Sequence, residues 1–165
     1  MLNILHEVER LLPKLLEDSS SWNTLFIDYH PPIVERVWRQ WNEYRICLHR
    51  IYSCEKNEAL FHQHPWPSAM KVLEGVYEMN VGYGKSAAPP PVAATILLPA
   101  GSEYEMIHPQ GWHSVRPLEK VTMSLMVTGK PRDEGSPQSA KPLCPLPENT
   151  KEEILRFFQD CYKES

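Results

Sequence analysis

The chain has 165 residues, of which 42% are hydrophobic and 23% are charged, so it is long enough for one domain with a core and too apolar for a disordered polymer. Its net charge is −4 and no cluster of Lys or Arg stands out, which argues against nucleic acid as a partner. No apolar run approaches the roughly 20 residues that span a bilayer, and the first residues lack the pattern of a signal peptide, so we expect no membrane attachment.

The N-terminal segment predicts two helices. Residues 2–17 carry apolar side chains at helical spacing, with Pro13 as a candidate break, namely Leu5, Val8, Leu12 and Leu15. Residues 33–42 follow two prolines, which are favoured in a first helical turn, and predict a second, short helix.

From Tyr44 to Gly129 the sequence pattern changes to short β-like runs, which are bounded by Gly, Pro or polar residues. These runs cover residues 45–52, 60–64, 70–81, 92–99, 113–117 and 121–127, with a tight turn inside the longest one at Leu73–Gly75. No helical segment separates them, which argues against a parallel α/β sheet and favours an antiparallel sandwich or barrel.

The chain ends in a proline-rich loop over residues 130–149 and a closing helix, for which Thr150 and Glu153 have the spacing of a capping box. We therefore expect a single domain over residues 1–165. It comprises a helical N-terminal extension (1–43), a β core (44–129), and a loop with a C-terminal helix (130–165).

The four cysteines form no CxxC pair, and a disulfide framework in a chain of this size would be denser. They are interpreted as free thiols, which predicts a cytoplasmic location. The seven histidines and 16 prolines point to a loop-rich β protein with side chains available as ligands.

The strongest local feature is the pair His62 and His64. Side chains at positions i and i+2 of a strand point to the same face, so both imidazoles can reach one point. Neutral imidazole suits Fe, Ni, Cu, Mn or Zn. A single HxH pair is weak evidence for a metal site, because two histidines often occur at this spacing by chance on a solvent-exposed surface.

The surroundings of this pair resemble the cupin superfamily. His62-x-His64 followed by Gly75 has the register of the first cupin motif, and Gly101, Pro109, Gly111 and His113 resemble the second. The resemblance covers roughly residues 44–129 and implies a small antiparallel β-barrel of the cupin (jelly-roll) type. It further implies a metal site whose ligands are His62, His64 and His113.

Two departures from the cupin pattern bear on the site. Ser68 stands where many cupins have a metal-binding Glu, and Lys56 stands where the first motif usually opens with Gly. The remaining set of three histidines resembles the iron centre of the thiol dioxygenases, which are also cupins. It leaves coordination positions open for a substrate.

The resemblance implies one divalent metal, with Fe(II) favoured over Ni, Zn or Mn, and an iron-dependent dioxygenase that acts on a small thiol or carboxylate-bearing substrate. An arginine would hold the carboxylate, with Arg50 chosen over Arg45 and Arg116, and Tyr104 would transfer a proton near the metal. His49 lines the cavity or faces solvent, depending on the strand register.

Other functions stay open. A cupin can bind a metal or ligand without turnover, as a sensor or carrier, and other metal-dependent cupins are isomerases or lyases. Ser68 is also compatible with a barrel that holds no metal. A homodimer is expected from the resemblance alone.

Overall fold

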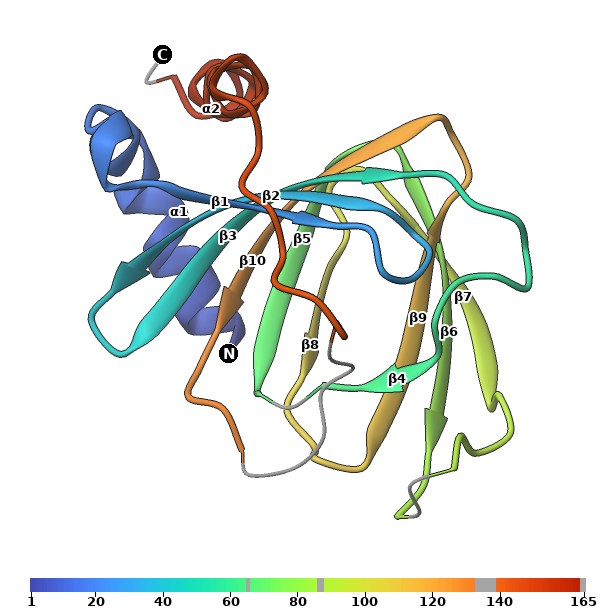
Figure 1. The fold of residues 1–165 in the computed structure, drawn as a ribbon. Helices are drawn as coiled ribbons and strands as arrows, with labels where there is room; N and C mark the ends of the chain where they lie inside the picture. Colours follow the sequence, from blue (N-terminus) through green and yellow to red (C-terminus); the bar gives the residue numbers. More distant parts are fainter. Residues whose placement is uncertain (65, 86–87, 133–138, 164–165) are drawn as a thin grey trace.

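Two antiparallel sheets make up most of the molecule in the computed structural model, which describes residues 1–64, 66–85, 88–132 and 139–163 (Figure 1). Within these ranges the larger sheet has six strands in the order β1-β2-β3-β10-β5-β8, and the smaller has four in the order β4-β9-β6-β7. The strands are β1 (Asn23–Ile27), β2 (Val34–Trp41), β3 (Tyr44–Tyr52), β4 (His62–Gln63), β5 (Ser68–Glu74), β6 (Val76–Tyr83), β7 (Ala94–Pro99), β8 (Glu103–Met106), β9 (Gly111–Pro117) and β10 (Val121–Thr128).

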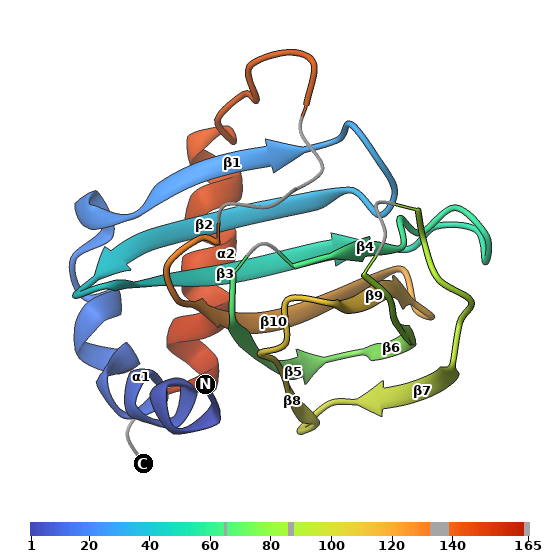
Figure 2. The ribbon, with the colours of Figure 1, turned by 90° about the horizontal axis from the view of Figure 1, so that it is seen from below.

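Two helices flank the larger sheet on the side away from the smaller one: α1 (Leu2–Leu16) and α2 (Glu148–Cys161) (Figures 1 and 2). The buried stripe of α1 comprises Leu5, Val8, Leu12 and Leu16, and Pro13 lies inside the helix without splitting it. A short 3-10 turn, η1 (Ser19–Ser21), follows α1. The predicted mainly β architecture with an N-terminal and a C-terminal helix is confirmed. Within the described ranges, neither helix combines the length and the apolar character that a membrane span requires.

The larger sheet has two buried faces, because side chains alternate along each strand. On β3, Ile46 and Leu48 pack into the core beneath the helices, whereas Cys47 and Ile51 belong to a separate core on the opposite face. A slip of one residue would exchange these two sets, so the two apolar cores fix the register of the strand.

Residues 33–42 form a strand and not the predicted helix. β2 pairs with β3 over its full length, and its residues 34–38 pair with β1 on the other side. Its valines and tryptophans fit a pleated surface well, and the pairing with two neighbours outweighs the helical spacing. Thus the N-terminal 43 residues are helical only in α1 and η1, and the strands β1 and β8 were not anticipated.

Two local predictions have different outcomes. The predicted turn within residues 70–81 is present: Gly75 joins β5 to β6 with φ of 83°, and a Cβ there would lie 2.7 Å from Thr122 Oγ1. The capping box at Thr150 and Glu153 is wrong, because α2 begins earlier, at Glu148, with no side-chain cap. The Glu153 carboxylate instead accepts a hydrogen bond from Arg50 at 3.0 Å.

Candidate metal centre

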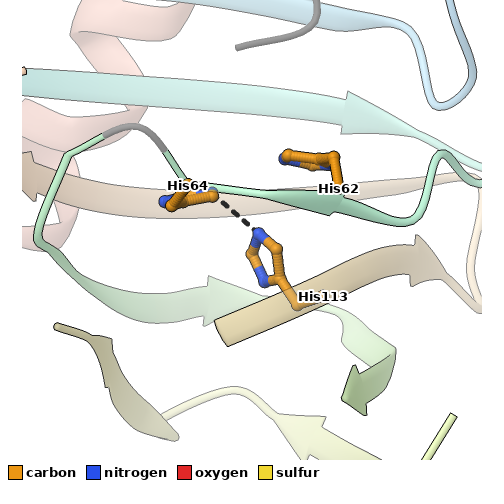
Figure 3. A group of neighbouring side chains, drawn as sticks. All are labelled: His62, His64 and His113. Carbon is orange, nitrogen blue, oxygen red and sulfur yellow. Dashed lines mark hydrogen bonds between the residues drawn. The ribbon is translucent and has the colours of Figure 1, made fainter. Parts of the chain in front are cut away.

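Three imidazoles meet between the two sheets, as the HxH pattern and His113 predict. His62 on β4 and His113 on β9 are direct partners in the antiparallel register, and His64 follows two residues after His62. The Nε2 atoms of His64 and His113 lie 2.7 Å apart, and one nitrogen from each of the three rings lies within 4.8 Å of the others (Figure 3). This grouping places three nitrogen donors around one point.

The hydrogen bonds of two rings favour ligation through Nε2. Nδ1 of His62 donates to the carbonyl oxygen of Leu60 at 2.9 Å, and Nδ1 of His64 lies 2.9 Å from the hydroxyl of Ser68. When Nδ1 carries the proton, Nε2 keeps its lone pair and is free to bind a metal, which is the arrangement that orients metal-binding histidines generally. The Ser68 hydroxyl therefore contacts the imidazole ring of a candidate metal ligand.

Burial keeps the three rings neutral. It lowers the pKa of His64 to about 3, with a smaller contribution from the neighbouring His62. Burial likewise lowers the pKa of His62, and it lowers the pKa of His113 well below its ordinary value. Only the neutral form of imidazole binds a metal, so these rings are prepared as ligands at neutral pH.

The rings line a cavity of about 180 Å³ whose wall is mostly apolar. Its apolar side chains come from both sheets and from the segment that precedes α2, and they include Ile51, Trp66, Met70, Val115, Met126 and Leu143. A volume of this size suits a small ligand, and the apolar wall strengthens electrostatic interactions inside the cavity.

An arginine and a buried histidine form one wall of the cavity. Nε of Arg36 on β2 donates to Nε2 of His49 on β3 at 2.8 Å, and His49 is only 2% exposed. Burial, followed by the charge of Arg36, lowers the pKa of His49 well below its ordinary value. His49 thus lies on the cavity side, which resolves the two alternatives of its strand register. Arg36 was missed, because the segment that carries it was expected to be a helix.

Arg50 and Tyr104 do not line this cavity. Arg50 lies on the opposite face of β3 from His49 and makes ion pairs with Glu35 and Glu153. The ring centre of Tyr104 is 6.3 Å from that of His113, and its hydroxyl donates to Sδ of Met70 at 3.0 Å. Burial raises the pKa of Tyr104, which keeps the phenol protonated.

The other two arginine candidates also have partners. The guanidinium of Arg45 lies 4.7 Å above the centre of the Trp38 ring, and Arg116 pairs with Glu78 at 3.0 Å. Among the arginines weighed from the sequence, none lines the histidine cavity. Arg36 alone among the arginines of the described residues does so.

Comparison with known proteins places the fold. No protein-family model matches the chain, and no curated protein sequence matches it. Hydroxypropylphosphonic acid epoxidase from S. wedmorenis is similar in structure, with a TM-score of 0.50 and 17% identity over 67% of this chain. KdgF from Halomonas sp. has a TM-score of 0.49 and 15% identity over 66% of this chain and 89% of its own. EutQ from Clostridium difficile has a TM-score of 0.47 and 10% identity over 66% of this chain and 78% of its own.

The epoxidase has the cupin fold, and the chain has this fold too, as its two sequence motifs predict. The match covers 56% of the epoxidase, so this chain corresponds to little more than half of that enzyme's length. At this level of identity the likeness concerns the arrangement of the strands, and the chemistry of the site has to be argued from its own residues.

Proposed function

We propose that this chain is a mononuclear metal enzyme, an Fe(II)-dependent dioxygenase that acts on a small substrate bearing a carboxylate or a thiol. The observation that carries the proposal is the group of three neutral imidazoles, His62, His64 and His113, in an apolar cavity. Three protein ligands leave coordination positions open, which is the requirement for catalysis at a metal.

The donor set fits a metal that accepts nitrogen ligands. Imidazole suits Fe, Ni, Zn and Mn alike, and iron is proposed because a redox-active ion supplies the oxygen chemistry that the resemblance to thiol dioxygenases implies. The position of the usual carboxylate ligand is Ser68, whose hydroxyl is bonded to the His64 ring instead. The chain therefore contributes no negative charge at this position, and an anionic substrate meets less repulsion there.

Arg36 is the proposed anchor for the substrate carboxylate. Its guanidinium lines the cavity, and its Nε bond to His49 fixes the orientation of the planar group. Within the described residues its other two nitrogens have no hydrogen-bond partner, so they are free to bind both oxygens of a carboxylate. The proposal thus assigns to Arg36 the role that the sequence assigned to Arg50. The role of Tyr104 in proton transfer stays a prediction.

A cytoplasmic location is part of the proposal, because all four cysteines are unpaired and one of them, Cys47, is buried. The homodimer stays a prediction from the resemblance.

The decisive experiment is metal analysis of protein purified without a histidine tag and without added metal, in parallel with a His62→Ala/His64→Ala variant. We expect close to one equivalent of iron in the unchanged protein and its loss in the variant. His108→Ala, which removes an exposed histidine outside the group of three, is the matched control and should keep the metal. Absence of metal in the unchanged protein after loading with Fe(II) would overturn the proposal.

Oxygen uptake tests the reaction. The Fe(II)-loaded protein should consume oxygen with one or more members of a panel of small thiols and small carboxylates. Arg36→Met should raise KM for carboxylate-bearing substrates by roughly 10- to 100-fold, because a charge-assisted hydrogen bond is lost. Bound nickel or zinc without oxygen uptake would favour an isomerase or lyase. A metal-loaded protein that binds but does not convert its ligand would be a sensor or carrier.

A further inference from the structure

A second cleft adjoins the histidine cavity at the edge of the larger sheet. It has a volume of about 590 Å³ and lies between β1, β2 and the start of α2. Figure 2 shows the segment before α2 passing around the outer strand β1 to reach the helix. The cleft shares only Leu25 and Arg36 with the lining of the histidine cavity. We call it the basic cleft, after the three cations that line it, namely Arg36, Arg45 and Lys151.

The two arginines of the basic cleft lack carboxylate partners. Within the described ranges, neither Arg36 nor Arg45 makes an ion pair, and the Nε atom of Arg45 is buried without a hydrogen-bond partner. The guanidinium of Arg45 rests on the Trp38 ring, which holds its plane in place. Two guanidinium groups therefore line one cleft in a protein whose net charge is −4.

Lys151 reinforces this charge from the helix. Its side chain is only 13% exposed, and its sole ion-pair partner among the described residues is Glu148, at 3.4 Å. Glu148 is 73% exposed and is the one carboxylate that lines the cleft. The charged lining is thus three cations against one solvated anion. Lysine is rarely buried to this extent unless it is paired, and a weak surface partner does not account for it.

The start of α2 adds to the same potential. The helix begins after Pro147, which provides no side-chain cap, and its first intrahelical hydrogen bond runs from the Lys151 amide to the Pro147 carbonyl at 3.1 Å, so only the amides before Lys151 lack an acceptor within the helix. Glu148 and Lys151 of this turn line the cleft, which brings the positive end of the helix dipole to it.

We propose that the basic cleft is a second ligand site, which binds an oxyanion, either a phosphate or a carboxylate group of a small molecule. Arg45 and Lys151 supply the charge, the guanidinium plane of Arg45 supplies paired donors, and Arg36 closes the side toward the histidine cavity. The site does not depend on a bound metal, because the three histidines take no part in its lining, and it shares only Arg36 and Leu25 with the cavity where the reaction is proposed.

Calorimetric titration of the metal-free protein with inorganic phosphate, pyrophosphate and malonate tests the site. We expect saturable 1:1 binding of at least one of these anions, which weakens as sodium chloride is added. Binding of the phosphates alone assigns a phosphate ligand, and binding of malonate alone assigns a carboxylate. The absence of saturable binding by all three anions at low salt overturns the proposal.

Variants locate the anion. Arg45→Met and Lys151→Met should each weaken binding by about 10- to 100-fold, the effect of one charge-assisted hydrogen bond. Arg50→Met removes a cation from the same strand as Arg45 but outside the cleft, and it should leave the affinity unchanged. The His62→Ala/His64→Ala variant should also bind the anion normally, whatever the outcome of the metal analysis. Equal weakening by Arg50→Met, or no weakening by the two cleft variants, would mean nonspecific attraction and overturn the assignment.

Discussion

The two faces of the larger sheet use the same strands for opposite purposes. Under the helices, Ile46, Leu48 and Leu125 meet the apolar stripes of α1 and α2, and the buried members of this core are all hydrophobic. On the face toward the smaller sheet, the strands carry His49 and Arg36 beside Met70 and Met126, and they leave a cavity. Adjacent residues of one strand thus belong to a filled core and to a polar site.

This contrast separates stability from chemistry along one strand. The apolar face holds the sheet and both helices together, since burying apolar surface is the main favourable contribution to folding. The cavity face keeps neutral imidazoles out of water and shields a guanidinium in part, which costs free energy and is tolerated where hydrogen bonds or a bound ligand compensate it. Changes on the two faces should therefore have different consequences.

The largest effect should come from acid, which lowers the free energy of unfolding through the buried histidines of the cavity face. The folded protein lowers the pKa of His49, His62, His64 and His113, so at mildly acidic pH the unfolded chain binds more protons than the folded one. The metal-free protein should keep its full stability above the ordinary pKa of 6.5 and lose it as the pH falls toward the lowered values, about 3 for His64. Each histidine contributes on the order of 1 kcal/mol per pH unit.

Urea denaturation of the metal-free protein between pH 7.5 and 5 measures this slope. His49→Gln should make the slope shallower, because one buried histidine is removed, whereas the exposed His108→Gln should leave it unchanged. A stability independent of pH over this range would show that the cavity admits charged imidazole at no cost, and the contrast between the faces would fail.

Phe158→Ala should destabilise the apolar core between the larger sheet and the helices. Phe158 of α2 is fully buried in the apolar core, and truncation of such a side chain costs about 3–5 kcal/mol. Phe157→Ala, on the partly exposed neighbour, should cost clearly less. Folded Phe158→Ala protein should still bind the metal, because no histidine of the site contacts this core. Urea denaturation gives the loss of stability, and loss of metal from the folded variant would contradict the separation of the two faces.

Sequence alone predicts the part of the site that depends on local geometry. His62 and His64 share a face on any strand, and His113 was placed beside them by the second motif. Arg36 could not be placed, because the apolar residues of its segment suit a helix as well as a strand, and only the pairing with β1 and β3 decides between them. The side of the sheet on which His49 lies was likewise undetermined until the register of β3 was known.

Ser68→Ala tests the cavity face through a smaller effect, a change in metal affinity. The hydroxyl contacts Nδ1 of His64, and if His64 is a metal ligand as proposed, loss of such a partner behind it lowers metal affinity by about 10- to 100-fold. Ser114→Ala is the control, since Ser114 is equally buried but bonds to Asn80. Competition with a chelator measures the affinities. Equal affinity in both variants would show that Ser68 has no part in orienting the ring.

Arg50→Met should have the smallest effect on the cavity site, and it tests the contrast between the two faces most directly. Arg50 follows His49 in sequence, and it lies on the other face, where it joins Glu35 of β2 to Glu153 of α2. Because Glu153 is 56% exposed, its ion pair with Arg50 contributes about 1 kcal/mol or less, whereas the Arg50–Glu35 pair is largely shielded from water and its loss lowers the stability further. Metal content and KM should not change, unlike in Arg36→Met. If folded Arg50→Met raised KM for a carboxylate substrate as much as Arg36→Met does, the substrate would reach the helix side of β3, and the two faces would not be functionally distinct.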